Sequence, residues 1–190
     1  NRPNLDFRGY CGRIAAGRIS RGENVRVVPS GVSSTVKEII LGSQELDVAE
    51  CGQSVTLTLA DEVDISRGDL LVAADAPVEV ADQFEVHLVW MAEQPLVAGR
   101  PYLLRIHNKE VSARVTRIKY REDINTGAKL AAEQLRLNEI GVVTLSTSQP
   151  IPFETYAVNR TLGGFILVDR LNFATVGAGM IHFSLRRAGN

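Results

Sequence analysis

Ala174-Thr175-Val176-Gly177-Ala178-Gly179-Met180-Ile181 is the stretch of this chain that decides the fold. It follows the apolar run Phe165-Ile166-Leu167-Val168 and the turn residues Asp169 to Asn172, so the segment as a whole is typical of a β-hairpin. Glycine occurs twice in the second strand, which predicts that a neighbouring backbone or a tight bend lies where side chains would not fit. Such a hairpin closes a small β-barrel and is not an active site.

The composition is that of an ordinary globular protein. Of the 190 residues 45% are hydrophobic, and the net charge of -1 creates no field that would draw the chain onto nucleic acid or an anionic membrane. No apolar run approaches the roughly 20 residues that span a bilayer. The two cysteines, Cys11 and Cys51, form no disulfide or thiolate-metal pattern, and we interpret both as structural. We therefore expect a soluble, cytoplasmic chain.

Short strands with period-2 alternation fill both halves of the sequence. Val55, Leu57 and Leu59 alternate with hydroxyl residues, and glycine turns recur about every ten positions. The small residues Ala73 to Pro77 interrupt this pattern and suggest a domain boundary near residue 78. The prediction is an all-β protein of two consecutive small β-barrels, 1–78 with an N-terminal linker and 79–190.

The second half has three predicted local features. Phe84, Val86, Leu88 and Trp90 share one face of a strand. The apolar parity slips near Thr116-Arg117, which predicts a β-bulge. Asn125 to Gln134 combines a capping residue with favourable helix formers, so we expect the one helix of the chain there.

The residues offer no complete phosphate-binding motif. A P-loop needs Gly-Lys-Ser/Thr, and none of Lys37, Lys109, Lys119 and Lys129 follows a glycine. Asp6-Phe7-Arg8-Gly9 fits the loose Asp-x-x-Gly pattern of a magnesium site, but a strand entering the first barrel explains it better. Asn108-Lys109 is better explained by a hairpin turn than by guanine recognition.

The residues that could bind a metal or a nucleic acid likewise do not form a recognisable motif. His87, His107 and His182 lie far apart without an i, i+4 pair, and the acidic run Asp61 to Asp64 lacks a glycine-turned calcium loop. Trp90 could stack against a base, but a role as an anchor of the barrel core is the more common one for such a tryptophan. We therefore predict no catalytic, cofactor-binding or metal-binding residue in this chain.

Two sets of motifs carry a family resemblance. Tyr10 to Gly22, Asp64 to Leu71 and Thr175 to Gly179 resemble the second and third domains of elongation-factor-Tu-like translational GTPases. More narrowly, Pro3 to Tyr10, Val89-Trp90-Met91-Ala92-Glu93-Gln94-Pro95-Leu96 and Gly163 to Leu171 resemble the GTPase (large) subunit of bacterial sulfate adenylyltransferase. The similarity extends over essentially the whole chain.

The resemblance implies a parent enzyme that hydrolyses GTP and couples this to a small catalytic subunit, a nucleotidyltransferase that makes adenosine 5'-phosphosulfate from ATP and sulfate. GTP and Mg²⁺ are then expected in an N-terminal GTPase domain upstream of Asn1, and the two barrels are expected to be inactive alone. The implied partners are that GTPase domain and the small subunit, without membrane or nucleic acid. The alternative is a tRNA-binding barrel arm of a translation factor, although Asp169-Arg170-Leu171-Asn172 replaces the arginine-led, glycine-rich turn typical of those factors.

Overall fold

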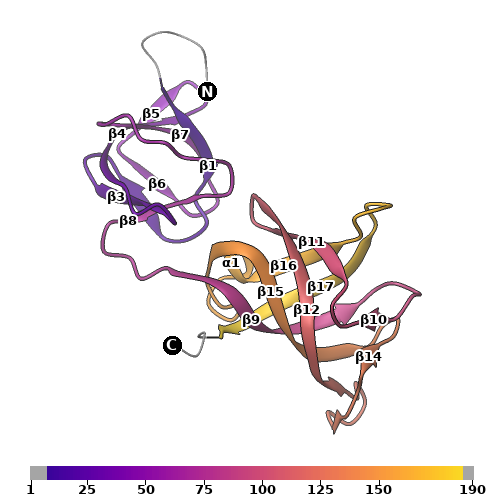
Figure 1. The fold of residues 1–190 in the computed structure, drawn as a ribbon. Coiled ribbons are helices and arrows are strands. Elements are labelled where there is room, and N and C mark those ends of the chain that lie inside the picture. Colours follow the sequence, from indigo (N-terminus) through magenta and orange to yellow (C-terminus); the bar gives the residue numbers. More distant parts are fainter. Residues whose placement is uncertain (1–7, 186–190) are drawn as a thin grey trace, which may run out of the picture. The chain divides into compact units, whose positions relative to one another are not determined.

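The computed structural model describes residues 8–185, which form an almost entirely β-structured chain (Figure 1). The chain divides between Val78 and Glu79 into two compact units. Every strand pair in the described range is antiparallel. The predicted all-β class is confirmed.

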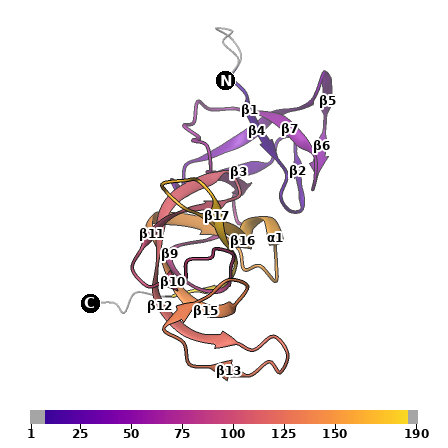
Figure 2. The ribbon, with the colours of Figure 1, turned by 90° about the vertical axis from the view of Figure 1, so that its right-hand side faces the viewer.

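The first unit contains eight short strands. In chain order they are β1 (Tyr10–Arg13), β2 (Arg18–Ser20), β3 (Asn24–Val28), β4 (Ser33–Leu41), β5 (Gln44–Leu46), β6 (Val48–Glu50), β7 (Ser54–Leu59) and β8 (Leu70–Ala73). The main sheet runs β1-β7-β4-β3-β8, with β5 paired to β4, while β2 and β6 pair with each other (Figure 2). Ile19 of β2 and Ala49 of β6 are buried in the same core as Val25 and Ile39, so the separate pair completes a small barrel.

The second unit is a closed barrel. Its elements are β9 (Glu79–Trp90), β10 (Leu96–Val97), β11 (Pro101–Ile106), β12 (Lys109–Glu122), β13 (Lys129–Leu130), β14 (Gln134–Leu135), β15 (Ile140–Phe153), the short helix α1 (Arg160–Gly163), β16 (Gly164–Val168) and β17 (Thr175–Ser184). Six strands follow the order β11-β16-β17-β9-β15-β12, and β12 pairs back to β11. The ring therefore has no unpaired edge along its circumference.

The two glycines of β17 lie against close neighbours. A Cβ built on Gly179 would lie 2.1 Å from the ring of Phe165, and one on Gly177 would lie 3.2 Å from a methyl carbon of Leu88. At Gly179 the close neighbour is thus an aromatic ring and not the predicted backbone or bend. Phe165 faces Gly179 across the β16–β17 ladder, so glycine makes room for the ring inside the barrel.

Two further local predictions have opposite outcomes. The bulge near Thr116-Arg117 is confirmed, because the β12–β15 register shifts between Val115 and Arg117. The helix predicted over Asn125 to Gln134 is wrong: this stretch contains a turn followed by β13 and β14.

Asp123 and Leu135 explain why no helix forms there. The Asp123 carboxylate accepts the backbone N–H groups of Asn125 and Thr126, at 2.8 and 3.1 Å, which holds a turn. Leu135 is completely buried, and β14 pairs with β10. Tertiary pairing and burial outweigh the modest helix propensity of the segment.

Candidate functional site

A hollow of about 400 Å³ opens on the surface of the second unit. One wall is the segment that follows β9, from Met91 to Gln94. The other belongs to the turn between β16 and β17 and is formed by Asp169, Leu171, Asn172 and Ala174. The buried rings of Trp90 and Tyr102 form part of the lining, 5.6 Å apart in an edge-to-face pair. The hollow thus brings together parts of two of the three stretches that resemble sulfate adenylyltransferase large subunits most narrowly, 89–96 and 163–171.

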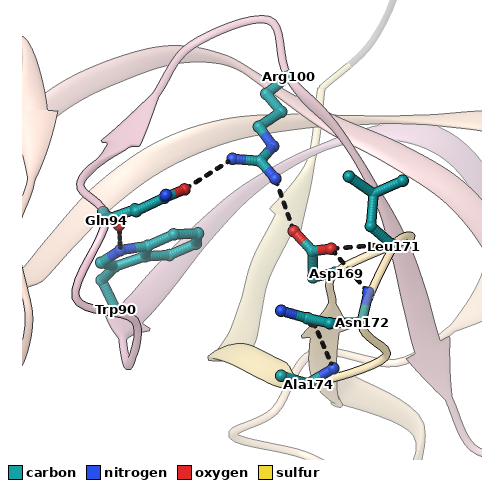
Figure 3. Close-up of polar contacts among 7 residues, drawn as sticks. All are labelled: Trp90, Gln94, Arg100, Asp169, Leu171, Asn172 and Ala174. Carbon is teal, nitrogen blue, oxygen red and sulfur yellow. Dashed lines mark hydrogen bonds and ion pairs between the residues drawn. The ribbon is translucent and has the colours of Figure 1, made fainter.

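Asp169 organises the turn that forms one wall (Figure 3). One carboxylate oxygen accepts the backbone N–H groups of Leu171 and Asn172, at 2.8 and 3.3 Å. The side chain of Asn172 accepts the N–H of Ala174 at 2.9 Å. Asx turns of this kind fix a loop through side-chain oxygens because no regular ladder is available to the backbone.

Arg100 ties the two walls together (Figure 3). Its guanidinium forms a 2.6 Å ion pair with Asp169 and donates a longer, 3.4 Å hydrogen bond to the Gln94 side chain. The indole N–H of Trp90 donates to the Gln94 carbonyl at 2.7 Å. One polar network therefore joins three segments of the chain, and its Arg100–Asp169 contact links residues 69 positions apart.

The electrostatics of this network stabilise the ionised form of Asp169. The Leu171 N–H, then the Asn172 N–H and the Arg100 charge, hold the pKa of Asp169 below its ordinary value, although its desolvation acts in the opposite direction. A carboxylate with a lowered pKa is a weak general base at neutral pH, and its oxygens are already occupied. The exposed apolar surface beside it suits contact with another molecule.

The residues singled out by sequence lie in ordinary structural settings. Asn108-Lys109 is at the turn between β11 and β12, as predicted, and Trp90 is 1% exposed, as expected of a core anchor. Asp6 and Phe7 lie outside the described residues. In the acidic run, Asp61 accepts the Ser34 hydroxyl at 2.8 Å, whereas Asp64 pairs with Arg8 at 2.9 Å, so these carboxylates do not converge.

The histidines are the residues that sequence reasoning placed too far apart. The rings of His87 and His182 are in edge-to-face contact, 5.6 Å between centroids, because β9 and β17 are neighbours. His182 also lies 3.6 Å from the buried Glu85, which Lys119 contacts. These contacts lower the pKa of Glu85, against a desolvation cost that acts to raise it. Strand pairing could have revealed this cluster, but sequence spacing could not.

Cysteine pairs, metal-binding clusters and membrane-spanning helices are absent from residues 8–185. Both cysteines are exposed and form no disulfide; the Cys11 thiol contacts the Thr56 hydroxyl and the Cys51 thiol contacts the Ala15 carbonyl. Over residues 8–185 no group of His, Cys, Asp or Glu has the geometry of a metal site. Within the same range, no helix is both long and apolar enough to traverse a membrane.

Known proteins resemble this chain along its whole length. It is 52% identical to the bifunctional enzyme NodQ of a Rhizobium species and 48% identical to the bifunctional enzyme CysN/CysC of Xylella fastidiosa, in both cases over 100% of the chain. It is 50% identical to sulfate adenylyltransferase subunit 1 of Sodalis glossinidius over 98% of the chain. The chain spans only 29%, 30% and 39% of these three relatives, respectively.

Solved structures and a family comparison agree on the fold. Sup35 complexed with GDP matches 94% of the chain and 44% of its own chain with a TM-score of 0.85, at 23% sequence identity. The likeness at this identity concerns the fold alone. Residues 83–182 match the family described as GTP-eEF1A C-terminal domain-like. Since that match extends over more than half of the sequence, the chain belongs to the GTP-eEF1A C-terminal domain-like family.

Proposed function

We propose that this chain is the C-terminal β-barrel region of the GTP-hydrolysing regulatory subunit of sulfate adenylyltransferase. The parent enzyme would couple GTP hydrolysis in a preceding domain, with GTP and Mg²⁺ bound there, to synthesis of adenosine 5'-phosphosulfate from ATP and sulfate on a small catalytic subunit. The observation that carries the proposal is the 50% identity with sulfate adenylyltransferase subunit 1 over 98% of the chain. The proposed location is the cytoplasm, and the region itself is proposed to be inactive.

The physical properties of the second unit suit the role of a stiff arm. Nucleotide switches order segments near the γ-phosphate, and a rigid element packed on those segments converts a local change into displacement of a surface. A ring of six strands around a continuous core deforms little, because its interior is close-packed. Such an arm transmits motion without contributing chemical groups.

The competing function, a tRNA-binding arm of a translation factor, is supported by fewer observations than the sulfate adenylyltransferase role. Its structural support is the likeness to Sup35, which at 23% identity shows the fold alone. The net charge of -1 adds nothing toward phosphate binding. The sulfate adenylyltransferase role explains the similarity of the whole chain and is therefore the stronger proposal.

The test uses the full-length parent protein and the small subunit from the same organism. We expect the two proteins to co-purify and to form adenosine 5'-phosphosulfate in a GTP-dependent assay, and we expect deletion of 79–190 to abolish the GTP dependence. Aminoacyl-tRNA is the competing ligand in a parallel binding measurement. Absence of any complex with the small subunit, or tight tRNA binding in its place, would contradict the proposal.

A further inference from the structure

The turn between β16 and β17 projects large apolar side chains into solvent. Leu171 is 86% exposed and Phe173 is 65% exposed, and only Asn172 separates them along the chain. Met91, 48% exposed, lies on the opposite wall of the hollow. Leu171 and Met91 line the hollow, and Phe173 lies on the same turn as Leu171. Single exposed apolar residues are common on protein surfaces, but a group of them on one turn and the hollow beside it is typical of an interaction site.

The backbone of this turn is held in place and is partly strained. Asp169 accepts two N–H groups of the turn through its side chain and the Phe173 N–H, at 3.0 Å, through its carbonyl. Phe173 adopts a left-handed conformation, with φ of 57°, which is strained for a residue other than glycine. Because the Phe173 side chain stays largely in solvent, the barrel gains little packing from it in return. Strain without a packing gain indicates a role outside the fold.

The charge that the turn offers to a partner is positive. Asp169 is neutralised by Arg100, whereas Arg170 is exposed and has no ion-pair or hydrogen-bond partner within residues 8–185. The free cation is thus adjacent to Leu171 in the chain. The complementary surface is an apolar pocket edged by a carboxylate, and aromatic, methionine and arginine side chains are enriched in such contacts.

We propose that the turn Asp169–Phe173 is the contact through which the second barrel docks on a separate protein subunit that offers such a pocket. The proposal rests on the function proposed above and takes the small subunit of sulfate adenylyltransferase as that partner. A second copy of this chain is a poorer occupant, because a two-fold contact centred on the turn would bring one Arg170 against the other. Held rigid by the Asp169 network, the turn would bind with little loss of conformational entropy.

The experiment measures binding of the full-length large subunit to the small subunit by isothermal titration calorimetry. The double variant Leu171→Ser/Phe173→Asn removes the apolar groups, and asparagine tolerates the left-handed backbone. The single variant Arg170→Glu reverses the free charge. The matched control is Val158→Ser, because Val158 is 75% exposed on the same unit and lies outside the turn.

We expect the double variant to raise Kd at least about tenfold and Arg170→Glu to raise it at least about fivefold, with the control within twofold of the wild type. Circular dichroism verifies that each variant is folded. If the double variant does not fold, the Kd of Arg170→Glu alone tests the proposal. Wild-type affinity in the variants would overturn the docking site alone. A wild-type protein that does not bind the small subunit at all would overturn the proposed function and this site together. Loss of self-association with unchanged small-subunit binding would also refute the proposal.

Discussion

Substitution Gly179→Ala tests whether the closing hairpin has room for a side chain. A Cβ at this position would lie 2.1, 2.6 and 2.7 Å from three atoms of the Phe165 ring, whereas ordinary contacts begin at 3.4 Å. The ring must therefore move by about 1.3 Å, the difference between 3.4 and 2.1 Å. Phe165 is only 5% exposed and belongs to the continuous core, so the movement disturbs other side chains.

The expected cost is that of overpacking a core, about 1–3 kcal/mol in the free energy of unfolding. Gly177→Ala is the matched control on the same strand, because its Cβ would meet its nearest neighbour at 3.2 Å. A shift of a few tenths of an ångström relieves that contact, and alanine loses less backbone entropy on folding than glycine. The control should therefore stay within about 1 kcal/mol of the wild type.

Urea unfolding followed by tryptophan fluorescence measures these differences in the second unit alone. The chain has one tryptophan, and Trp90 lies in the core of that unit. A double-mutant cycle with Phe165→Leu, which shortens the ring side chain, should recover at least about 1 kcal/mol of the Gly179→Ala loss. The reasoning fails if Gly179→Ala is as stable as the wild type, or if Phe165→Leu gives no recovery.

Three other changes probe separate features. Gly163→Ala should cost more than Gly179→Ala, about 3 kcal/mol, because its Cβ would meet backbone atoms of Tyr156 at 2.4 and 2.6 Å; thermal unfolding measures the loss. Phe173→Gly should change the stability by no more than about 1 kcal/mol, because relief of the left-handed strain offsets the lost side chain; a urea midpoint far below the wild type would contradict this. The Leu171 N–H chiefly lowers the pKa of Asp169 from 3.8, so the stability it contributes is complete above that pH and is lost as the pH falls through the lower folded value. Asp169→Asn should remove this acid-dependent part, as measured by urea unfolding at pH 6 and pH 2.

Sequence patterns predicted the strands of the barrels well, because strands and turns are encoded by residues that are close together in the chain. The strand with Phe84 to Trp90 on one face, the glycine-bearing hairpin and the bulge at Thr116-Arg117 all follow from alternation and turn chemistry over a few residues. Asn125 to Gln134 failed for the opposite reason. Its local propensity favours a helix, but the pairing of β13 with β12 and the burial of Leu135 involve distant residues.

Sequence patterns could not predict the candidate site, because it too depends on contacts between residues that are distant in the chain. Arg100 and Asp169 are 69 positions apart, and no sequence motif indicates that their side chains form an ion pair. The similar segments 89–96 and 163–171 were recognised separately, but only the strand order of the barrel brings them to one hollow. The contact between His87 and His182 depends likewise on the pairing of β9 with β17.

The strand order of the second barrel has a consequence for its biogenesis. The last strands, β16 and β17, insert between β11 and β9, which are made first. During translation, one edge of β9 and one edge of β11 therefore have backbone hydrogen-bonding groups without a partner strand. They stay unpaired until the chain has emerged from the ribosome as far as Ser184. Exposed strand edges recruit other chains, so premature termination within the hairpin should yield an aggregation-prone product that depends on chaperones.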